Sequence, residues 1–318
     1  MLQKRFAEKK YKKTLFSRYD MEEAVFYFSE KEFPGLRKNK FDFKNGRGER
    51  LSGYFFSYEG ADESRIIVFD HGLSVGYRSY FREVETLCAA GYTVYTFDHT
   101  GCTESEGEGI HGFVGSLSDL DDCITALKKE FPHKPISVVG HSRGGYSTMN
   151  IPALHPDIKH AVAISGFPSV KDMHAQLIPA FAKKVRALVY SIEEEDSPKY
   201  AGASAIESLK QTDTKVLFIH SADDRVVSKK HYEKLRSALK DVPNISFLLL
   251  EGKNHNPHYT ADAVKYKDAF FIEYKRRKKK KLLETKEQRE AFKSSFDWWK
   301  MTEQDDGVWE KIIAHLNS

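Results

Sequence analysis

The chain has 318 residues, of which 40% are hydrophobic and 30% are charged, and its formal net charge is +4. This length is sufficient to bury a substantial core, either as one large α/β domain or as two smaller ones, and the composition is that of a globular protein with a charged surface. Every apolar run falls short of the roughly 18 residues that a membrane-spanning helix needs, so we expect no transmembrane segment.

The cysteines and the N-terminus bear on the cellular compartment. Cys88, Cys102 and Cys123 form no Cys-x-x-Cys pair and lack metal-ligand spacing, which speaks against a disulfide framework and against a zinc site. The first residues, Met1 to Arg5, are basic but lead into no apolar stretch of the kind found in a secretory signal. We therefore expect a cytoplasmic protein.

The first part of the chain precedes the main pattern. Residues 1–20 are charged with scattered aromatic side chains and predict a helical arm. Residues 24–28, 40–43 and 51–56 are β-prone, and the turn residues 45–48 join the last two runs. We interpret this region as a meander or hairpin.

From residue 66 onward, short and almost continuous apolar runs alternate with helix-length segments such as 117–131 and 228–239. Strands buried on both faces have this composition, and the alternation predicts an α/β fold with a mostly parallel twisted sheet and helices on both faces. Functional groups are then expected at the carboxyl ends of the strands. The predicted strands are residues 66–69, 93–97, 136–139, 161–164, 215–219 and 245–250, and residues 308–316 predict a terminal helix.

Two segments interrupt the alternation. Residues 171–213 carry apolar side chains at helical spacing, and both an ordinary crossover helix and a small helical cap over the site fit them, although Pro179 weakens a single straight helix. Residues 256–304 read as a helical insertion that contains the basic run 275–281. No Pro-, Gly- or Ser-rich linker divides the chain, so we expect residues 1–318 to form one domain.

The pentapeptide Gly140-His141-Ser142-Arg143-Gly144 follows the predicted strand 136–139 and precedes a helix-compatible segment. A serine on a sharp turn between a strand and a helix is the nucleophile elbow of many hydrolases, and the two glycines relieve crowding around the strained backbone. Ser142 is thus the candidate nucleophile.

A serine hydroxyl needs a general base, because an alcohol is a poor nucleophile at neutral pH. His255 follows the predicted strand 245–250 through a loop in which Gly252 can turn the chain back over the strand ends, and His258 is its competitor. The base needs a carboxylate to orient it. Asp223 and Asp224 both follow the strand 215–219, and either could serve.

With these residues in order, the chain resembles the α/β-hydrolase superfamily, in particular its serine esterase and lipase branch, with similarity to monoacylglycerol lipases and serine aminopeptidases. The resemblance extends over about residues 40–255 and the terminal helix. It implies a triad of Ser142, Asp224 and His255, with Asp223 second to Asp224. Residues 97–105 resemble an Asp-x-Arg-Gly-x-Gly-x-Ser loop of these enzymes but depart from it at Thr100 and Thr103.

The oxyanion hole requires two backbone N–H groups. The residue after the nucleophile, Arg143, supplies one, and the resemblance of His71-Gly72-Leu73 to a family His-Gly-x motif implies that Leu73 supplies the other. A second pair, His111-Gly112, follows no strand and is expected to be loop structure. The side chain of Arg143 is left free to meet substrate.

The expected function is hydrolysis of a carboxylic ester through an acyl-enzyme, without a metal or an organic cofactor. An aminopeptidase-like amide hydrolase is the first alternative, and a non-catalytic binding protein of the same fold is the second. The expected partner is a small-molecule ester or a short peptide as substrate. No nucleic-acid partner is expected, because a basic run such as 275–281 is more often a solvated helix face.

Overall fold

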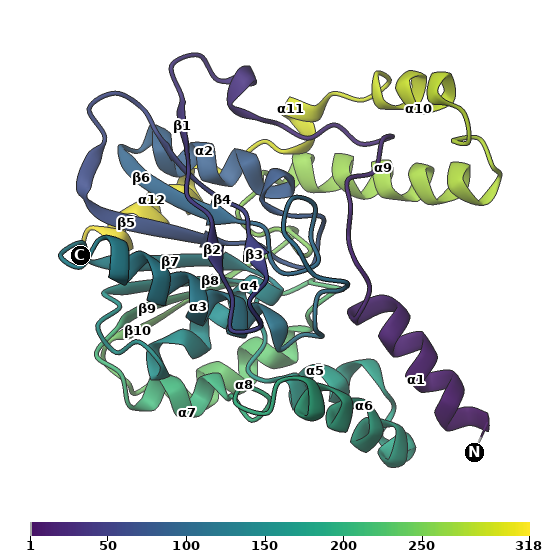
Figure 1. The fold of residues 1–318 in the computed structure, drawn as a ribbon, viewed down its shortest axis with the longest axis horizontal. Helices are drawn as coiled ribbons and strands as arrows, with labels where there is room; N and C mark the ends of the chain where they lie inside the picture. The colour runs from purple at the N-terminus through teal and green to yellow at the C-terminus, as the bar shows by residue number, and fades with distance from the viewer. Residues whose placement is uncertain (1) are drawn as a thin grey trace.

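A computed structural model describes residues 2–318, with side chains described from Arg5 onward, and it contains one eight-stranded sheet in the order β1-β4-β6-β5-β7-β8-β9-β10 (Figure 1). Strands β5 to β10 run parallel, and β1 and β4 are antiparallel to their neighbours. The predicted α/β fold with a mostly parallel sheet is confirmed. The strands are β1 (Arg37–Lys40), β4 (Gly53–Ser57), β5 (Asp62–Asp70), β6 (Tyr92–Phe97), β7 (Ile136–His141), β8 (His160–Ile164), β9 (Lys215–Ser221) and β10 (Ile245–Leu250).

Helices cover both faces of the sheet, and alternate strand residues pack against each layer. In β5, Ile66 and Val68 belong to one core cluster while Ile67 and Phe69 belong to another. Burial on both faces is the reason that these strands are apolar without interruption. One face carries α2 (Phe81–Ala89) and α12 (Asp306–Leu316), and the other carries α3 (Gly115–Glu130), α4 (Arg143–Asn150), α7 (Ala205–Lys210) and α8 (Lys229–Leu239) (Figure 1).

The order of the strands creates a topological switch point at the centre of the sheet. The chain goes from β5 to β6 on one side and then crosses to β7 on the other side of β5. At such a switch point the loops at the carboxyl ends of the two central strands diverge, which leaves room for a ligand. The loop after β5 and the pentapeptide after β7 both lie there.

The N-terminal region differs in part from expectation. Strands β2 (Phe43–Lys44) and β3 (Arg50–Leu51) form the small hairpin around residues 45–48. The strand predicted over residues 24–28 is wrong, because this stretch is an irregular segment. Its aromatic rings pack on tryptophans of the C-terminal insertion, with 6.1 Å between the ring centroids of Phe26 and Trp298 and 4.8 Å between those of Phe28 and Trp299.

Helix α1 (Leu2–Leu15) lies within the predicted arm of residues 1–20, whose first residue, Met1, lies outside the described residues. The Tyr11 hydroxyl of α1 donates to Glu193 and lies 2.7 Å from His174 Nε2. After the helix, Arg18 donates to the carbonyl oxygens of Ser105 and Gly107, each at 2.9 Å. The segment that follows α1 is therefore fixed to the body of the protein.

The segment 171–213 contains several helices rather than one. Helix α5 (Val170–Leu177) ends before Pro179, and α6 (Lys183–Asp196) begins after it, with the short helix η4 (Ala180–Ala182) between them. Proline lacks the N–H group that would continue the helix. The remaining short helices are η1 (Glu30–Glu32), η2 (Tyr77–Tyr80) and η3 (Ile151–Ala153).

The C-terminal segment 256–304 contains α9 (Ala261–Lys279), α10 (Lys286–Lys293) and α11 (Trp298–Met301), which project from the body above the level of α1 in Figure 1. Phe270, Phe292 and Met301 form a small core of their own together with Ala24. Some basic side chains near the exposed end of α9 are paired, since Arg276 contacts Glu273 and Lys278 contacts Glu22. Within residues 2–318, no helix combines the length and apolarity that crossing a membrane requires.

Candidate active site

Ser142 stands on a strained turn between β7 and α4. Its φ of 58° and ψ of −114° are a backbone conformation that residues other than glycine rarely adopt. Its N–H donates to the carbonyl oxygen of Ile164 at 2.8 Å. A Cβ atom at Gly144 would overlap the carbonyl oxygen of Asp70, and one at Gly140 would overlap Thr148. The two glycines thus allow β7 and α4 to meet closely enough to expose the serine at the turn.

His255 lies in the loop after β10 with its ring directed at Ser142. Its Nε2 is 2.9 Å from the Ser142 hydroxyl oxygen, and its Nδ1 is 2.8 Å from a carboxylate oxygen of Asp224. Gly252 and Asn254 both have positive φ, 70° and 43°, so the loop turns sharply before the histidine. The structure therefore brings Ser142, His255 and Asp224 into one hydrogen-bonded chain.

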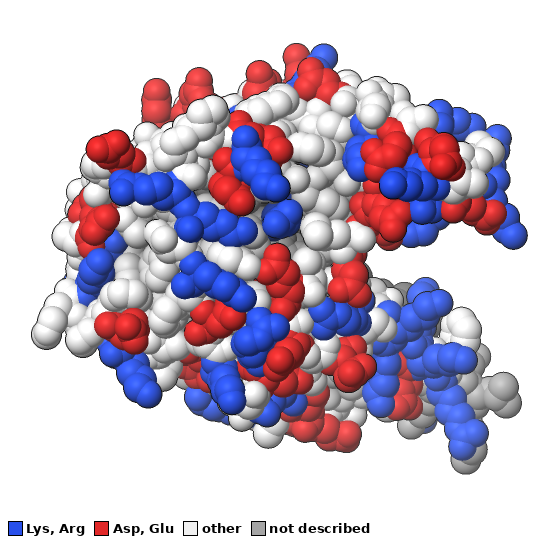
Figure 2. All heavy atoms as spheres, turned by 45° about the horizontal axis from the view of Figure 1, so that its top comes forward, with Lys and Arg blue, Asp and Glu red and all other residues white. Residues whose placement is uncertain are grey.

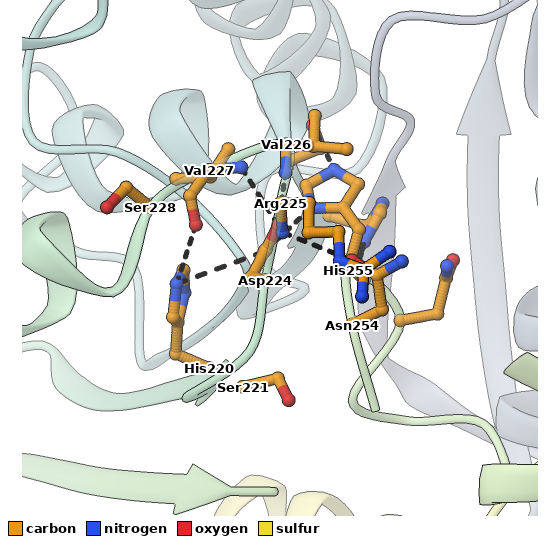
Figure 3. Close-up of polar contacts among 12 residues, drawn as sticks. His220, Ser221, Asp224, Arg225, Val226, Val227, Ser228, Asn254 and His255 are labelled. Carbon is orange, nitrogen blue, oxygen red and sulfur yellow. Dashed lines mark hydrogen bonds and ion pairs between the residues drawn. The ribbon is translucent and has the colours of Figure 1, made fainter. Parts of the chain in front are cut away.

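Asp224, and not Asp223, is the carboxylate that contacts the histidine. Figure 3 shows Asp224 between His255 and His220, and its second oxygen accepts hydrogen bonds from the N–H groups of Val226 and Val227 at 2.8 and 2.9 Å. These two donors fix the carboxylate plane, so its other oxygen points at His255. Asp223 turns away and accepts from the Ser221 hydroxyl at 2.6 Å.

His258, the competitor for the role of base, belongs to a separate buried cluster. Its Nε2 lies 3.0 Å from Glu83 Oε1, which also accepts from the Tyr259 hydroxyl at 2.8 Å. Burial raises the pKa of Glu83, but the hydrogen bonds from His258 and Tyr259 and the nearby positive charges together outweigh burial and hold that pKa below the usual value. His258 thus ties the start of the insertion to α2.

The two N–H groups proposed for the oxyanion lie next to Ser142. Arg143 is the first residue of α4, and the first N–H groups of a helix have no acceptor within the helix. Leu73 follows Gly72, where a Cβ atom would lie 3.1 Å from the Cβ of Ser142, so the loop after β5 passes beside the serine. Leu73 itself is 37% exposed.

The side chain of Arg143 does not face the substrate, and the expectation that it would be free is wrong. The guanidinium is buried, with Nη2 donating to the carbonyl of Ile110 at 2.7 Å. Its positive charge also lowers the pKa of the buried Glu193, although burial dominates and raises that pKa overall. Arg143 is held inside the protein by polar groups far away in sequence.

His141, which occupies the variable position before the serine, is a site residue that sequence reasoning missed. Its Nε2 lies 2.7 Å from the backbone carbonyl oxygen of His255, and its Nδ1 lies 3.0 Å from the Tyr80 hydroxyl. A carbonyl only accepts, so the proton is on Nε2 and Nδ1 accepts from Tyr80. Burial lowers the pKa of His141 well below its usual value, which keeps the ring neutral.

The loop 97–105 is anchored by a buried cluster below the site. His99 lies between Asp70 at 2.7 Å and Asp119 at 3.1 Å. Thr100, one of the departures from the family pattern, donates to Asp119 through both its N–H and its hydroxyl, each at 2.8 Å. Burial raises the pKa of the neighbouring Asp98 to about 7. His111, in the second His-Gly pair, lies in a loop and contacts Asp196 at 2.8 Å.

Comparison with known proteins shows similarity to hydrolases. A model of the hydrolase family described as serine aminopeptidase, S33, matches residues 61–198. The chain is 26% identical over 220 residues to the uncharacterised protein YfhR of Escherichia coli (strain K12), an alignment that covers 67% of this chain and 72% of that protein. It is 27% identical over 182 residues to the monoacylglycerol lipase of Mycolicibacterium smegmatis, covering 56% of this chain and 60% of the lipase.

Solved structures agree on the fold. The esterase Pf2001 of Pyrococcus furiosus superposes with a TM-score of 0.60 at 19% identity and covers 80% of this chain and 95% of the esterase. The α/β hydrolase GrgF from Penicillium sp. sh18 superposes with a TM-score of 0.53 at 16% identity, covering 69% and 91%. The resemblance stated from the sequence is confirmed, and the chain has the α/β-hydrolase fold.

Proposed function

We propose that this chain, which has the α/β-hydrolase fold, is a serine hydrolase that cleaves a carboxylic ester through an acyl-enzyme on Ser142. The observation that carries the proposal is the hydrogen-bonded chain from Ser142 through His255 to Asp224, with 2.9 and 2.8 Å between the heavy atoms. These distances are within reach for proton transfer from the hydroxyl to the imidazole.

In the first half-reaction, the Ser142 hydroxyl oxygen attacks the carbonyl carbon of the ester while His255 Nε2 takes the proton. Asp224 holds the other ring nitrogen and stabilises the imidazolium that forms. The imidazolium then protonates the leaving alcohol, which leaves the acyl group on Ser142. In the second half-reaction, His255 takes a proton from water, the resulting nucleophile attacks the acyl carbon, and Ser142 is released with its proton restored.

The negative charge that develops on the carbonyl oxygen needs preorganised donors. The N–H of Arg143, at the start of α4, and the N–H of Leu73, in the loop beside Ser142, are the two groups we assign to it. The N-terminal end of α4 adds a partial positive charge at the same place. Both donors are backbone groups, one in the first turn of α4 and one in the loop after the buried strand β5, so little reorganisation is needed during reaction.

An amide substrate would use the same machinery, and the family match to serine aminopeptidases makes a peptidase the second candidate. An aminopeptidase also has to recognise the positive α-amino group of its substrate. The carboxylates near His255 have internal partners, since Asp268 accepts from Asn254 at 3.0 Å and Glu22 pairs with Lys278 at 2.8 Å. The surface of the adjoining cavity is mostly apolar, which favours an apolar ester.

The test is reaction of the folded protein with a fluorophosphonate probe, followed by identification of the labelled residue by mass spectrometry. We expect labelling at Ser142 that is lost in Ser142→Ala and in a heat-denatured sample. A folded protein that stays unlabelled contradicts the proposal and supports a binding protein of the same fold.

Ester and amide activity are separated by a second measurement on the same preparation. We expect turnover of p-nitrophenyl butyrate that is lost in Ser142→Ala, and much slower turnover of aminoacyl p-nitroanilides. Faster cleavage of the anilides than of the esters would replace the esterase assignment by the peptidase one.

A further inference from the structure

A cavity of about 700 Å³ adjoins His255, at the place where the C-terminal insertion and the segment after α1 meet the sheet. Figure 2 shows the molecule hollowed between two projections that bear many basic side chains, which are α9 with α10 and α1. The volume is in the range of small-molecule binding sites. Its walls come from residues 18–28, 73–83 and 267–302, together with His141, Val226 and residues 254–256.

Aromatic and other apolar side chains form most of the lining. The ring of Phe270 packs against Trp298 with 5.1 Å between centroids and against Phe271 with 5.2 Å. These rings hold one another in place, so the cavity is formed before a ligand arrives. The apolar lining residues include Phe26, Phe28, Phe270, Phe271, Trp298 and Met301.

Several charged groups in the same walls contact other parts of the protein. Glu22 pairs with Lys278 at 2.8 Å, and Arg18 donates to the backbone carbonyl of Ser105 at 2.9 Å. The guanidinium of Arg82 lies over the ring of Trp299, 4.7 Å from its centroid. The polar groups thus fix the walls in position, and an apolar ligand fits the remaining surface better than an ionic one.

The position of the cavity relates it to the chemistry at Ser142. His255 and Leu73, to which the proposed function assigns the proton transfer and one oxyanion donor, both line it. A group attached to the carbonyl carbon of a bound ester would therefore enter the cavity directly. Two of the three walls, residues 18–28 and 267–302, lie outside the stretch 61–198 that matches the hydrolase family.

We infer that this cavity binds the acyl chain of the ester and that the substrates are esters of aliphatic acids longer than acetate. The inference rests on the proposed function, which it deepens by naming the substrate class. The segment after α1 and the insertion α9–α11 then determine acyl specificity, rather than the helices of residues 171–213.

The first test measures kcat/KM for p-nitrophenyl acetate, butyrate, octanoate and dodecanoate. Each added methylene that is buried in the cavity raises kcat/KM by up to about fourfold, until the cavity is filled. We expect Phe271→Ala to flatten this rise.

The matched control is Ile272→Ala, because Ile272 follows Phe271 on α9 but lies outside the cavity lining. Ile272 is 70% exposed, whereas Phe271 is 42% exposed and lines the cavity. We expect Ile272→Ala to keep the wild-type dependence on acyl length.

Phe181→Ala tests the rival location of the acyl site, because Phe181 lies in η4 within residues 171–213 and is 90% exposed. A profile that is flattened by Phe181→Ala and unchanged by Phe271→Ala overturns the inference.

A binding experiment separates failure of this inference from failure of the proposed function. In Ser142→Ala, which cannot form an acyl-enzyme, a dansyl-labelled fatty acid is expected to bind with increased fluorescence. Val25→Trp, which fills the cavity from the segment after α1, should weaken binding at least tenfold while circular dichroism shows an intact fold.

The outcomes of the two experiments are then distinct. Binding that Val25→Trp weakens, in a protein that hydrolyses no ester, supports the apolar site and contradicts the proposed function. Ester turnover with a flat acyl-length profile, together with fatty-acid binding that Val25→Trp leaves unchanged, contradicts this inference and leaves the proposed function standing.

Discussion

The imidazole of His141 donates a hydrogen bond from Nε2 to the backbone carbonyl of His255, with 2.7 Å between the two atoms. His141 immediately precedes Ser142 in the chain, while His255 lies in a loop after the last strand of the sheet. The bond therefore links the loop that carries the proposed base directly to the turn that carries the proposed nucleophile. The ring of His141 is in turn held by the Tyr80 hydroxyl at 3.0 Å.

This contact makes His141 a positioning residue. We expect His141→Leu to lower kcat for a short ester by roughly tenfold to a hundredfold, because small displacements of a catalytic group cost about that much in rate. KM for the same ester is expected to change little, since His141 binds no substrate. His141→Gln can still donate to the His255 carbonyl, so we expect it to recover much of kcat. Equal losses in both variants would contradict the positioning role.

The two neighbouring aspartates offer a matched pair. Asp224→Asn removes the charge that stabilises the His255 imidazolium, and we expect kcat to fall about 10³- to 10⁴-fold. Asp223→Asn changes a side chain that contacts Ser221 and the loop before His255, and we expect a far smaller decrease. Steady-state kinetics on p-nitrophenyl butyrate checks both variants. The assignment fails if Asp223→Asn is the more damaging of the two.

The close approach of β5 to the nucleophile turn predicts a large stability effect at Gly144. A Cβ atom there would overlap the backbone carbonyl of Asp70. A backbone group in a strand cannot move aside as the end of a flexible side chain can. We expect Gly144→Ala to lower the free energy of unfolding by roughly 1–3 kcal/mol or more, as overpacking in a core does. Gly202→Ala is the control, because no atom lies within 4 Å of its added Cβ. Urea denaturation of both variants measures the difference.

Buried neutral histidines predict a loss of stability in mild acid. Burial lowers the pKa of His174 to about 4 and that of His220 to about 4, whereas a histidine in the unfolded chain titrates near 6.5. Below about pH 6.5 the unfolded chain takes up protons that the folded protein does not, so the free energy of unfolding falls as the pH is lowered towards 4. Above about pH 6.5 this contribution to stability is fully present.

The size of the effect can be checked at one position. Between pH 7 and pH 5, each such histidine contributes a decrease of roughly 2 kcal/mol in the free energy of unfolding. We expect His174→Gln to reduce the pH dependence by about that amount, and the exposed His133 provides the same substitution as a control. An unchanged pH dependence in His174→Gln would show that the pKa of His174 is the same in the folded and the unfolded protein.

Local patterns in the sequence were sufficient for the framework. Strands buried on both faces have to be apolar throughout, so their positions and the α/β fold could be predicted from the order of apolar runs and helix-length segments along the chain. The pentapeptide around Ser142 could be recognised because the glycine requirement is set by backbone crowding within five residues of the turn. His255 could be placed because the carboxyl ends of parallel strands meet at one edge of the sheet.

Contacts between distant segments decided the rest. Asp224 faces His255 because two backbone N–H groups orient its carboxylate. The local sequence does not distinguish Asp224 from its neighbour Asp223 in this respect. The Arg143 side chain is buried because the carbonyl oxygen of Ile110 accepts a hydrogen bond from its guanidinium. Residues 24–28 are irregular, and their aromatic rings pack on tryptophans of the insertion. The sequence by itself determined the strands of the parallel part of the sheet and the candidate nucleophile, since those depend on local sterics and burial. Only the tertiary structure decided what surrounds them, since hydrogen-bond partners and cavity walls are set by segments that meet through folding.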